Sequence, residues 1–457
     1  MSKESILNLE SLFHQISHDW FVENNFPYES ARRSGIFSAA LTIWLMILQR
    51  LTGMPLQASI VSILNDSSDG IFIKLNKKSK KLSFRNISTN SGGFSRARDR
   101  IELESIIGLA KHCEAKLRKK QNSEEKLYLL DGMCVTTAYS AKNEKAYPRY
   151  CSTGKDRKMH YPRVRLLTAH NLSNGIALPP IHGSMKDGET ALAWRYLNAF
   201  PQGSTVMGDR NFGNFSVAYK ANSLGHKVIF RMNEHIFKAA AGAENKDFDK
   251  VLEWKPSRLV LKTTPEIPQD ACIKGRFIKI TVNTPGFRPQ TLYFFSTAPG
   301  AAEEIATTYL QRLRVETHIH QLKQILKLEF VSAKTPERIQ KELAIAFLTF
   351  NLISSIMAAA AKHNNIPFSR ISFTATIRII SAFAPRFLKT QNSEQRLDII
   401  NKIYIAFNQT KLPLRKKQRS YPRVVKRKAS KYPSKALVED NKLDNKSDNQ
   451  ILNRDSK

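Results

Sequence analysis

The sequence predicts an α/β fold in which short strands carry two aspartates and a later helix carries a glutamate. Apolar runs lead to Asp131 and to Asp209, and Glu316 lies in the helical stretch 303–328. Strand and helix patterns alternate between these positions, as in folds where helices cover a sheet. The prediction is a central α/β core with a helical N-terminal region and a β-rich insertion.

The core begins with strand patterns around Asp131. The Asp131-Gly132 pair separates two apolar runs, so we predict two strands with Asp131 at the end of the first. A plain turn is the alternative for this pair. A turn-rich segment, Asn171–Gly175, then predicts a hairpin. The predicted strands are 126–130, 133–137, 163–169 and 176–181.

Helix and strand patterns alternate after the hairpin. A brief strand at 204–207 leads directly to Gly208-Asp209-Arg210. We predict helices at 187–199 and 215–224 and a further strand at 226–232. Asp209 therefore follows a strand, as a second candidate acid.

Residues 241–300 lose helical periodicity and predict a β-rich insertion, with strand segments at 257–262, 276–282 and 291–295. It falls within the 107 residues between Asp209 and Glu316 (316 − 209). Trp254 is the one tryptophan in this insertion.

The flanking regions are predicted to be helical. Residues 1–120 contain an amphipathic pattern at 94–119, which follows a small-residue loop at 90–93. The apolar stretches 36–51 and 344–361 contain polar residues, so we interpret them as buried helices and not as membrane spans. The stretch 339–361 is predicted to close the core, and 366–410 forms a helical C-terminal region.

Four polar side chains recur within the predicted helix 303–328. Because this stretch is predicted to be one continuous helix, Tyr309, Arg312, Glu316 and Lys323 fall on one stripe roughly 60° wide. A carboxylate among cations suits a metal ion beside a phosphodiester. A solvated helix face is the alternative.

The spacing Tyr-x2-Arg-x3-Glu-x6-Lys of these residues resembles the Y-R-E-K motif of bacterial insertion-sequence transposases of the insertion-sequence-four family. The resemblance implies a ribonuclease-H-like fold at 121–240 and 301–365, with the insertion at 241–300. It also implies that Asp131, Asp209 and Glu316 are catalytic and that residues 1–120 bind DNA. The predicted β-β-β-α-β-α-β order agrees with that fold.

The implied chemistry is in-line attack on phosphorus with two Mg²⁺ ions, which Mn²⁺ can replace. Asp131 would bridge both ions, while Asp209 and Glu316 would each hold one. Tyr309, Arg312, Lys323 and Arg210 are predicted DNA contacts. Some relatives insert a Trp beside a flipped base, which makes Trp254 a candidate, with core packing as the alternative. His318 and His320 are assigned to DNA contact or packing, because Mg²⁺ favours oxygen ligands.

The charge of the chain agrees with a DNA partner. The net charge is +33 over 457 residues, and the segment 411–435 holds eleven Lys or Arg and no acid. We predict that 411–457 is a basic, largely disordered tail that contacts phosphates. Four scattered cysteines and the lack of a signal peptide indicate a cytoplasmic, nucleoid-associated protein.

The function that follows is transposition: binding terminal inverted repeats, cleaving the element's ends and joining them to target DNA. The partners would be double-stranded DNA and a second copy of the chain in a synaptic complex, with no membrane. One alternative is a metal-dependent nuclease on the same fold, which would not join strands. The other is an inactive DNA-binding repressor, which the complete set of three acids disfavours.

Overall fold

In the computed structural model, the described residues are 20, 23–24, 37–53, 91–120, 126–149, 160–242, 247–282, 290–389 and 392–413. Nearly all of the basic tail predicted at 411–457 lies outside these ranges.

Within this part of the chain, nine strands form one mixed sheet in the order β3-β2-β1-β4-β5-β8-β7-β6, and β9 pairs with the far end of β1. β1 is antiparallel to β2 and parallel to β4, and β4 is parallel to β5. The strands are β1 (Leu127–Thr137), β2 (Arg163–Asn171), β3 (Ile181–Ser184), β4 (Thr205–Gly208), β5 (Lys227–Arg231), β6 (Phe248–Trp254), β7 (Ile273–Val282), β8 (Gln290–Ser296) and β9 (Phe330–Val331).

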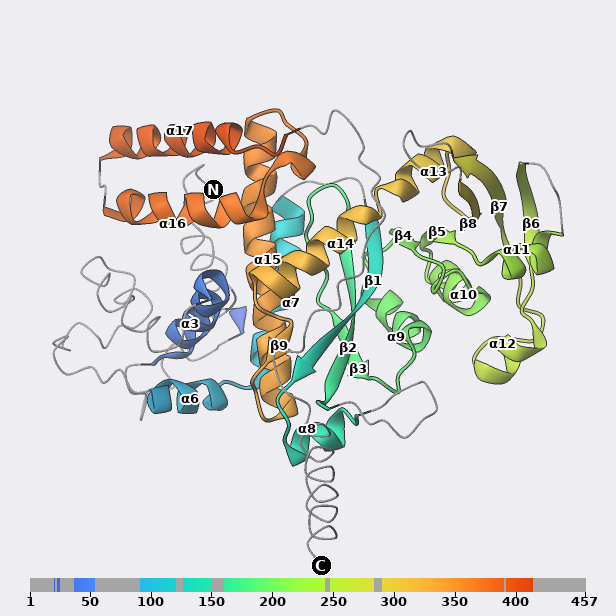
Figure 1. Ribbon diagram of the computed structural model, residues 1–457, viewed down its shortest axis with the longest axis horizontal. Coiled ribbons are helices and arrows are strands. Elements are labelled where there is room, and N and C mark those ends of the chain that lie inside the picture. Colours follow the sequence, from blue (N-terminus) through green and yellow to red (C-terminus); the bar gives the residue numbers. More distant parts are fainter. Residues whose placement is uncertain are drawn as a thin grey trace, which may run out of the picture.

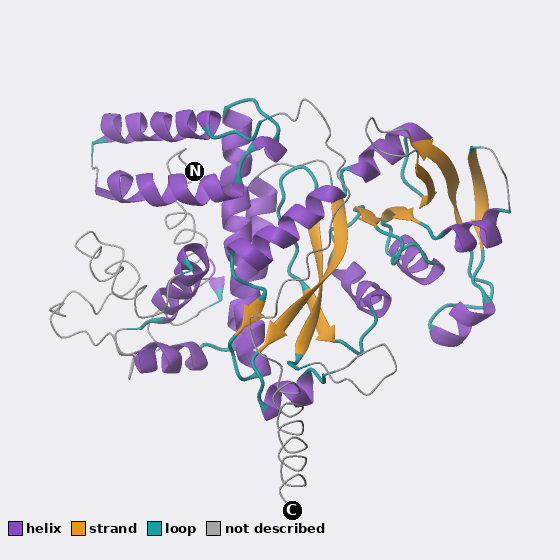
Figure 2. Cartoon of the chain, in the orientation of Figure 1, coloured by secondary structure: helices purple, strands orange, loops and turns teal. Residues whose placement is uncertain are grey.

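Helices cover both faces of the central strands (Figures 1 and 2). Successive side chains of a strand point to opposite faces. Leu130 of β1 is buried in a cluster with residues of α9 (Glu189–Tyr196) and α10 (Phe215–Ser223). Leu129 is buried in another cluster with residues of α13 (Ala302–Leu310) and α14 (Leu313–His320). Asp131 therefore shares the α14 face, and Gly132 shares the α9 face.

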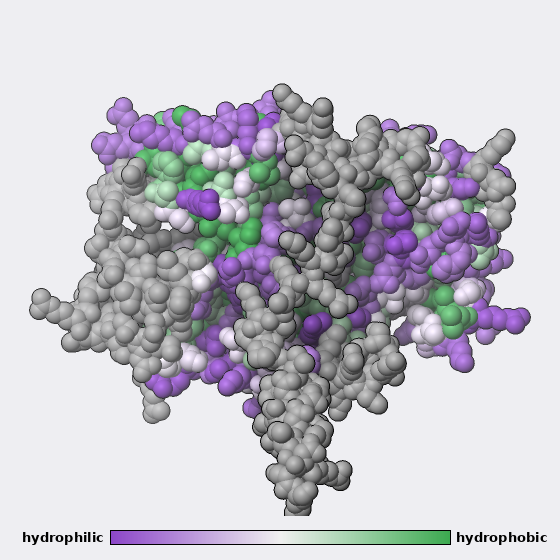
Figure 3. Space-filling view, viewed as in Figure 1, coloured by the Kyte–Doolittle hydropathy of each residue, from purple (hydrophilic) through white to green (hydrophobic). Residues whose placement is uncertain are grey.

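A long apolar helix, α15 (Pro336–His363), lies beside the central strands (Figure 1). It is long and apolar enough to cross a membrane, but 89% of its apolar window is buried inside the protein, as in a core helix. Residues 39–51 of the first predicted apolar segment and all of 344–361 thus lie in mostly buried helices, as predicted. Around α15 pack α3 (Ala39–Thr52), α7 (Leu103–Lys120), α16 (Phe373–Lys389) and α17 (Ser393–Gln409). Apolar surface gathers where α16 and α17 meet α15, whereas the insertion's surface is mainly hydrophilic (Figure 3).

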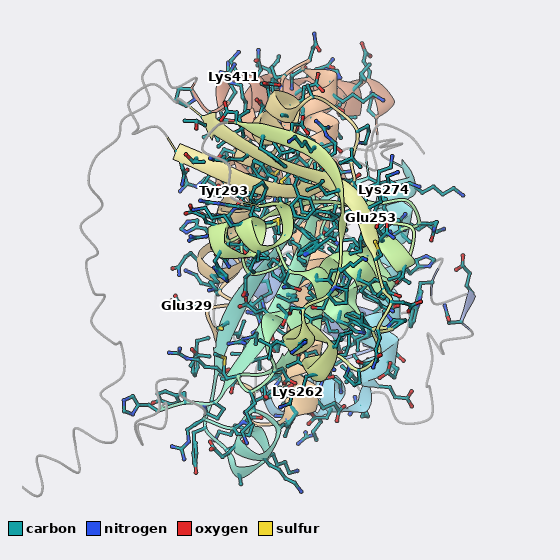
Figure 4. All side chains as sticks on the ribbon, turned by 90° about the vertical axis from the view of Figure 1, so that its right-hand side faces the viewer. Glu253, Lys262, Lys274, Tyr293, Glu329 and Lys411 are labelled. Atoms are coloured by element: carbon teal, nitrogen blue, oxygen red, sulfur yellow. The ribbon has the colours of Figure 1, made fainter. Side chains whose placement is uncertain are left out.

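The insertion is β-rich, and it extends the central sheet because β8 pairs with β5. On β6 and β7, Glu253 lies opposite Lys274, an opposite-charge pair that favours this register (Figure 4). The strand predicted at 257–262 is wrong, because the segment forms α12 (Arg258–Thr263). The Ser257 side chain accepts a hydrogen bond from the Val260 N–H and caps this helix.

The two strands predicted around Asp131 are one continuous strand. β1 pairs with β2 from Tyr128 to Thr136, and Asp131 lies opposite Thr168. Asp131-Gly132 is therefore neither a turn nor a strand end. β4 pairs only with residues 127–129 and β9 only with 136–137, so the other edge of β1 has no described strand partner at Asp131. Asp131 thus faces a gap in the sheet.

The helix predicted at 303–328 is interrupted. Hydrogen bonds from Gln311 N to Thr308 O (3.1 Å) and from Arg312 N to Tyr309 O (2.8 Å) tighten the chain between α13 and α14. A wider π turn, η5 (Gln321–Ile325), follows α14. The tight turn before α14 and the π turn after it both depart from α-helical spacing. The four motif residues therefore do not form the predicted single stripe. Tyr309 is 5% exposed, whereas the Glu316 side chain is 51% exposed.

Two other predicted boundaries shift. The amphipathic helix predicted at 94–119 is two helices, α6 (Ser91–Arg100) and α7, and α6 includes glycines that we predicted to form a loop. The Asn171–Gly175 turn forms, with Gly175 at φ +72°, but residues 176–181 contribute one isolated bridge before β3. The remaining short elements are α8 (Ala141–Ala146), η4 (Leu197–Ala199), α11 (Glu234–Ala241) and η6 (Phe368–Arg370).

Candidate active site

Asp131 lies on β1, and Asp209 comes directly after the neighbouring parallel strand β4, at the same level. Leu129 of β1 pairs with Met207 of β4, and each aspartate follows its paired residue by two positions. Both paired residues belong to the same buried cluster, so the two aspartates extend the face covered by α14. Asp131 is close enough for the Asp209 charge to raise its pKa. The strand register therefore brings the two predicted acids together.

Local backbone donors orient both carboxylates. The Gly132 N–H donates to Asp131 Oδ1 at 2.7 Å. The Asn211 N–H donates to Asp209 Oδ1 at 2.9 Å, within the turn that follows β4. In each aspartate the backbone N–H bonds to Oδ1, which leaves Oδ2 able to accept a ligand.

The Arg312 side chain links Glu316 to Asp131. α14 packs on β1, and Val315 on its inner face is fully buried. Arg312 Nη1 lies 3.6 Å from Asp131 Oδ2, and Arg312 Nη2 lies 3.7 Å from Glu316 Oε1. One guanidinium thus spans an acid from the sheet and an acid from the helix.

The site carries more negative than positive charge around Asp131. Burial raises the pKa of Asp131 to about 6, against a lowering by the Gly132 N–H and by Arg312. The charges of nearby Asp209 and Glu189 make smaller raising contributions to this same value. A cation at this place would offset the excess charge.

The donor set fits a hard divalent cation, because Asp131, Asp209 and Glu316 offer only carboxylate oxygens. Among the described residues, no three His, Cys, Asp or Glu side chains already stand close enough to hold a metal ion. Arg312 lies between Asp131 and Glu316, and Glu316 is half exposed. Closing the three acids around a cation therefore requires movement of the Arg312 and Glu316 side chains.

The other predicted site residues are placed differently. Arg210 is exposed beside Asp209, and Lys323 is half-buried in the π turn after α14. Tyr309 is buried against Phe294, with 5.0 Å between the ring centroids. Its hydroxyl has no hydrogen bond of normal geometry, and its pKa is raised by burial and lowered by Arg312 and Arg231. Tyr309 therefore lies beneath the site and not on the surface.

Trp254 is a core residue. It is 5% exposed and contacts Phe295, Phe277 and Phe215, with ring centroids 4.8, 5.7 and 5.5 Å away. The candidate DNA contact is therefore corrected to the packing alternative. His318 is also buried, 4.8 Å from the His170 ring centroid, so it packs and does not contact DNA. His320 is exposed.

Sequence reasoning missed three residues that lie near the acids, namely Arg231, Glu189 and Asn211. Arg231 ends β5 level with Asp209, because Met207 pairs with Ile229. Glu189 begins α9 and accepts a hydrogen bond from the Asn211 side chain. No spacing in the sequence links these residues to Asp131, because the sheet register brings them together.

The arrangement defines a class of enzyme. The central strands follow the ribonuclease-H-like order, with carboxylates on β1, after β4 and on a later helix. Carboxylates that collect around hard cations, beside arginines that can hold phosphates, suit phosphoryl transfer on nucleic acid.

Comparison with known proteins agrees. Residues 122–352, just over half of the chain, match the family described as Transposase DDE domain. The chain belongs to this family of enzymes, named for its Asp-Asp-Glu acids, and has DDE transposase activity on DNA. The family implies a divalent metal.

A curated relative is Transposase InsG for insertion sequence element IS4 of Escherichia coli (strain K12). It is 23% identical over 320 residues, which cover 67% of this chain and 69% of the relative. A similar solved structure is the piggyBac transposase synaptic complex with hairpin DNA, with a TM-score of 0.43 and 9% identity. The similarity covers 88% of this chain and 84% of that chain.

Proposed function

We propose that this transposase binds the terminal inverted repeats of an insertion sequence, cleaves the element's ends and joins them to target DNA. Asp131, Asp209 and Glu316 are the catalytic acids. The observation that carries the proposal is the level placement of Asp131 on β1 and of Asp209 directly after β4, with Glu316 linked to Asp131 through Arg312.

The three acids are proposed to hold Mg²⁺. Asp131 lies centrally and would contact both ions of a pair, with Asp209 on one side and Glu316 on the other. When bound, the ions would activate the attacking oxygen and stabilise the leaving oxygen. Mn²⁺ should substitute, because it also accepts octahedral oxygen ligation.

The arginine that spans the acids has a second proposed role. A guanidinium can hold a phosphate through two parallel hydrogen bonds. Once cations and DNA enter, Arg312 would exchange its two carboxylates for the backbone of the cleaved strand. Arg210 and Lys323 would contact neighbouring phosphates, and buried Tyr309 would support Arg312 from below.

DNA binding beyond the site is proposed from charge. The net charge of +33 supports double-stranded DNA as the partner, with the N-terminal region 1–120 and the tail 411–457 adding contacts. We also propose a homodimer in the synaptic complex, since two element ends are joined together. The proposed location is the cytoplasm, at the nucleoid.

The direct test incubates the purified protein and Mg²⁺ with labelled DNA that bears the repeats flanking its own gene. Cleavage at the repeat ends, followed by joined products with a target plasmid, would support transposition. Cleaved but unjoined products would instead support the nuclease. Binding without cleavage would support the repressor.

A further inference from the structure

Glu189 directs its carboxylate toward β1 beside Asp131 and toward the turn that carries Asp209. The Asn211 side-chain amide donates to Glu189 Oε2, and the Asn211 backbone N–H holds Asp209. On the other side, a Cβ built on Gly132 would lie 2.6 Å from Glu189 Oε1. Gly132 is itself the N–H donor to Asp131. One carboxylate therefore lies against the residue that follows Asp131 and against the residue two positions after Asp209.

The ordinary role of a glutamate at the start of a helix does not account for this placement. Such a residue favours the helix N-terminus electrostatically. Glu234 is also the first residue of its helix, α11, and forms an ion pair with Lys238 at 2.7 Å. Glu189 makes no ion pair with a described Lys or Arg, and Asn211 is its side-chain hydrogen-bond partner. Its charge instead acts on Asp131.

The gap in the sheet gives Glu189 access to the site. Gly132 shares the α9 face of β1, whereas Asp131 and Glu316 lie on the α14 side. β4 ends at Gly208, and no described strand pairs with this edge of β1 until Thr136. The two faces of the sheet are therefore connected through this gap beside Asp131. Glu189 approaches the gap from the face opposite Glu316.

We propose that Glu189 is a fourth carboxylate of the active site, which shares with Asp131 and Asp209 a divalent cation bound between β1 and β4. This inference rests on the proposed metal-dependent function. Carboxylates from β1, the turn after β4 and α9 would hold such a cation, with Glu316 on the other face, once the side chains close around it. The absence of a side chain at Gly132 leaves room for the Glu189 carboxylate.

The test is Mn²⁺ binding to the full chain without DNA, measured by calorimetry and by electron paramagnetic resonance. Glu189→Gln keeps the volume and the acceptor for Asn211 but removes the charge. We expect about tenfold weaker Mn²⁺ binding, with an unchanged melting temperature in chelator. Glu234→Gln, at the matched position of α11, should bind Mn²⁺ like the unaltered protein.

Two further variants separate ligation from positioning. Gly132→Ala should weaken Mn²⁺ binding, because the new Cβ displaces the Glu189 carboxylate without altering it. This variant also serves if Glu189→Gln does not fold. Asn211→Ala removes the side-chain bond and should have a smaller effect than Glu189→Gln. An equal loss in Asn211→Ala would overturn the proposal, because Glu189 would then act only through Asn211.

Asp131→Asn distinguishes the two levels of inference. If Asp131→Asn weakens Mn²⁺ binding and Glu189→Gln does not, the fourth carboxylate is wrong and the proposed function stands. If neither variant changes Mn²⁺ binding, the proposed metal site itself is wrong. Weaker binding in both variants, with no change in Glu234→Gln, would support the fourth carboxylate.

Discussion

The Arg312 guanidinium lies 3.6 Å from the Asp131 carboxylate, although the two residues are 181 positions apart (312 − 131). The same guanidinium lies 3.7 Å from Glu316. Arg312 therefore partly neutralises the acids while no cation is present. Cation binding and release of Arg312 toward DNA would then be linked events, because both draw on the same carboxylates.

The role of Arg312 can be separated from that of the acids. Arg312→Ala should weaken binding of a pre-cut element end by at least about tenfold, since a charged hydrogen-bonded contact contributes roughly 1.5–3 kcal/mol. Mn²⁺ affinity should change much less. Arg312→Lys keeps the charge but lacks the planar guanidinium. Its end binding should therefore be weaker than that of the unaltered protein and stronger than that of Arg312→Ala. Unaltered end binding and processing in Arg312→Ala would contradict the phosphate role. Lys323→Ala should show a smaller effect than Arg312→Ala.

The raised pKa of Asp131 predicts a pH-dependent stability. The folded-state pKa of about 6 exceeds the unfolded value of 3.8, so the native state retains the proton longer and stability falls as pH rises through this window. In chelator, Asp131→Asn should raise the unfolding free energy by up to about 3 kcal/mol at pH 8. The gain should shrink toward pH 4.5. Urea unfolding at both pH values measures it, and an equal gain at both would contradict the assignment.

Trp254 is predicted to matter for stability. Trp254→Ala should lower the unfolding free energy by about 3–5 kcal/mol, because a large side chain leaves a packed aromatic cluster. Trp254→Phe should cost less and should leave DNA cleavage intact. A Trp254→Ala protein of normal stability that failed only in cleavage would favour the base-capture role instead.

The basic tail is tested through salt dependence. Removing residues 411–457 takes away eleven cations between Lys411 and Lys435. If they neutralise phosphates, affinity should fall alike for all DNA sequences. The slope of log affinity against log salt should become shallower by about 0.9 for each phosphate that is no longer neutralised. An unchanged slope would mean that the tail does not touch DNA.

The sequence was sufficient for the parts of the fold that depend on local pattern. Asp209 follows a short apolar strand, and the buried helices α3 and α15 have long apolar runs. The continuity of β1 through Asp131-Gly132 was not predictable locally, because pairing with β2 overrides a turn-like dipeptide. Likewise, the alternating pattern at 257–262 fits a short amphipathic helix as well as a strand, and the Ser257 cap favours the helix.

The site was only partly predictable for the same reason. The four-residue motif located Glu316 and Arg312, whose helical spacing survives in α14. It misplaced Tyr309, because a tight turn separates α13 from α14. Glu189 and Arg231 carry no local signal, since only the register of β1, β4 and β5 and the packing of α9 bring them to the aspartates.

The most direct test of the account is Mg²⁺-dependent cleavage of the element's own ends by Asp131→Asn, Asp209→Asn and Glu316→Gln. Each change removes a proposed metal-binding charge and little volume, so we predict no cleavage with end binding largely retained. Glu303→Gln, an exposed change in the first turn of α13, should cleave normally. Near-normal cleavage by any of the three acid variants would contradict the assignment at that position.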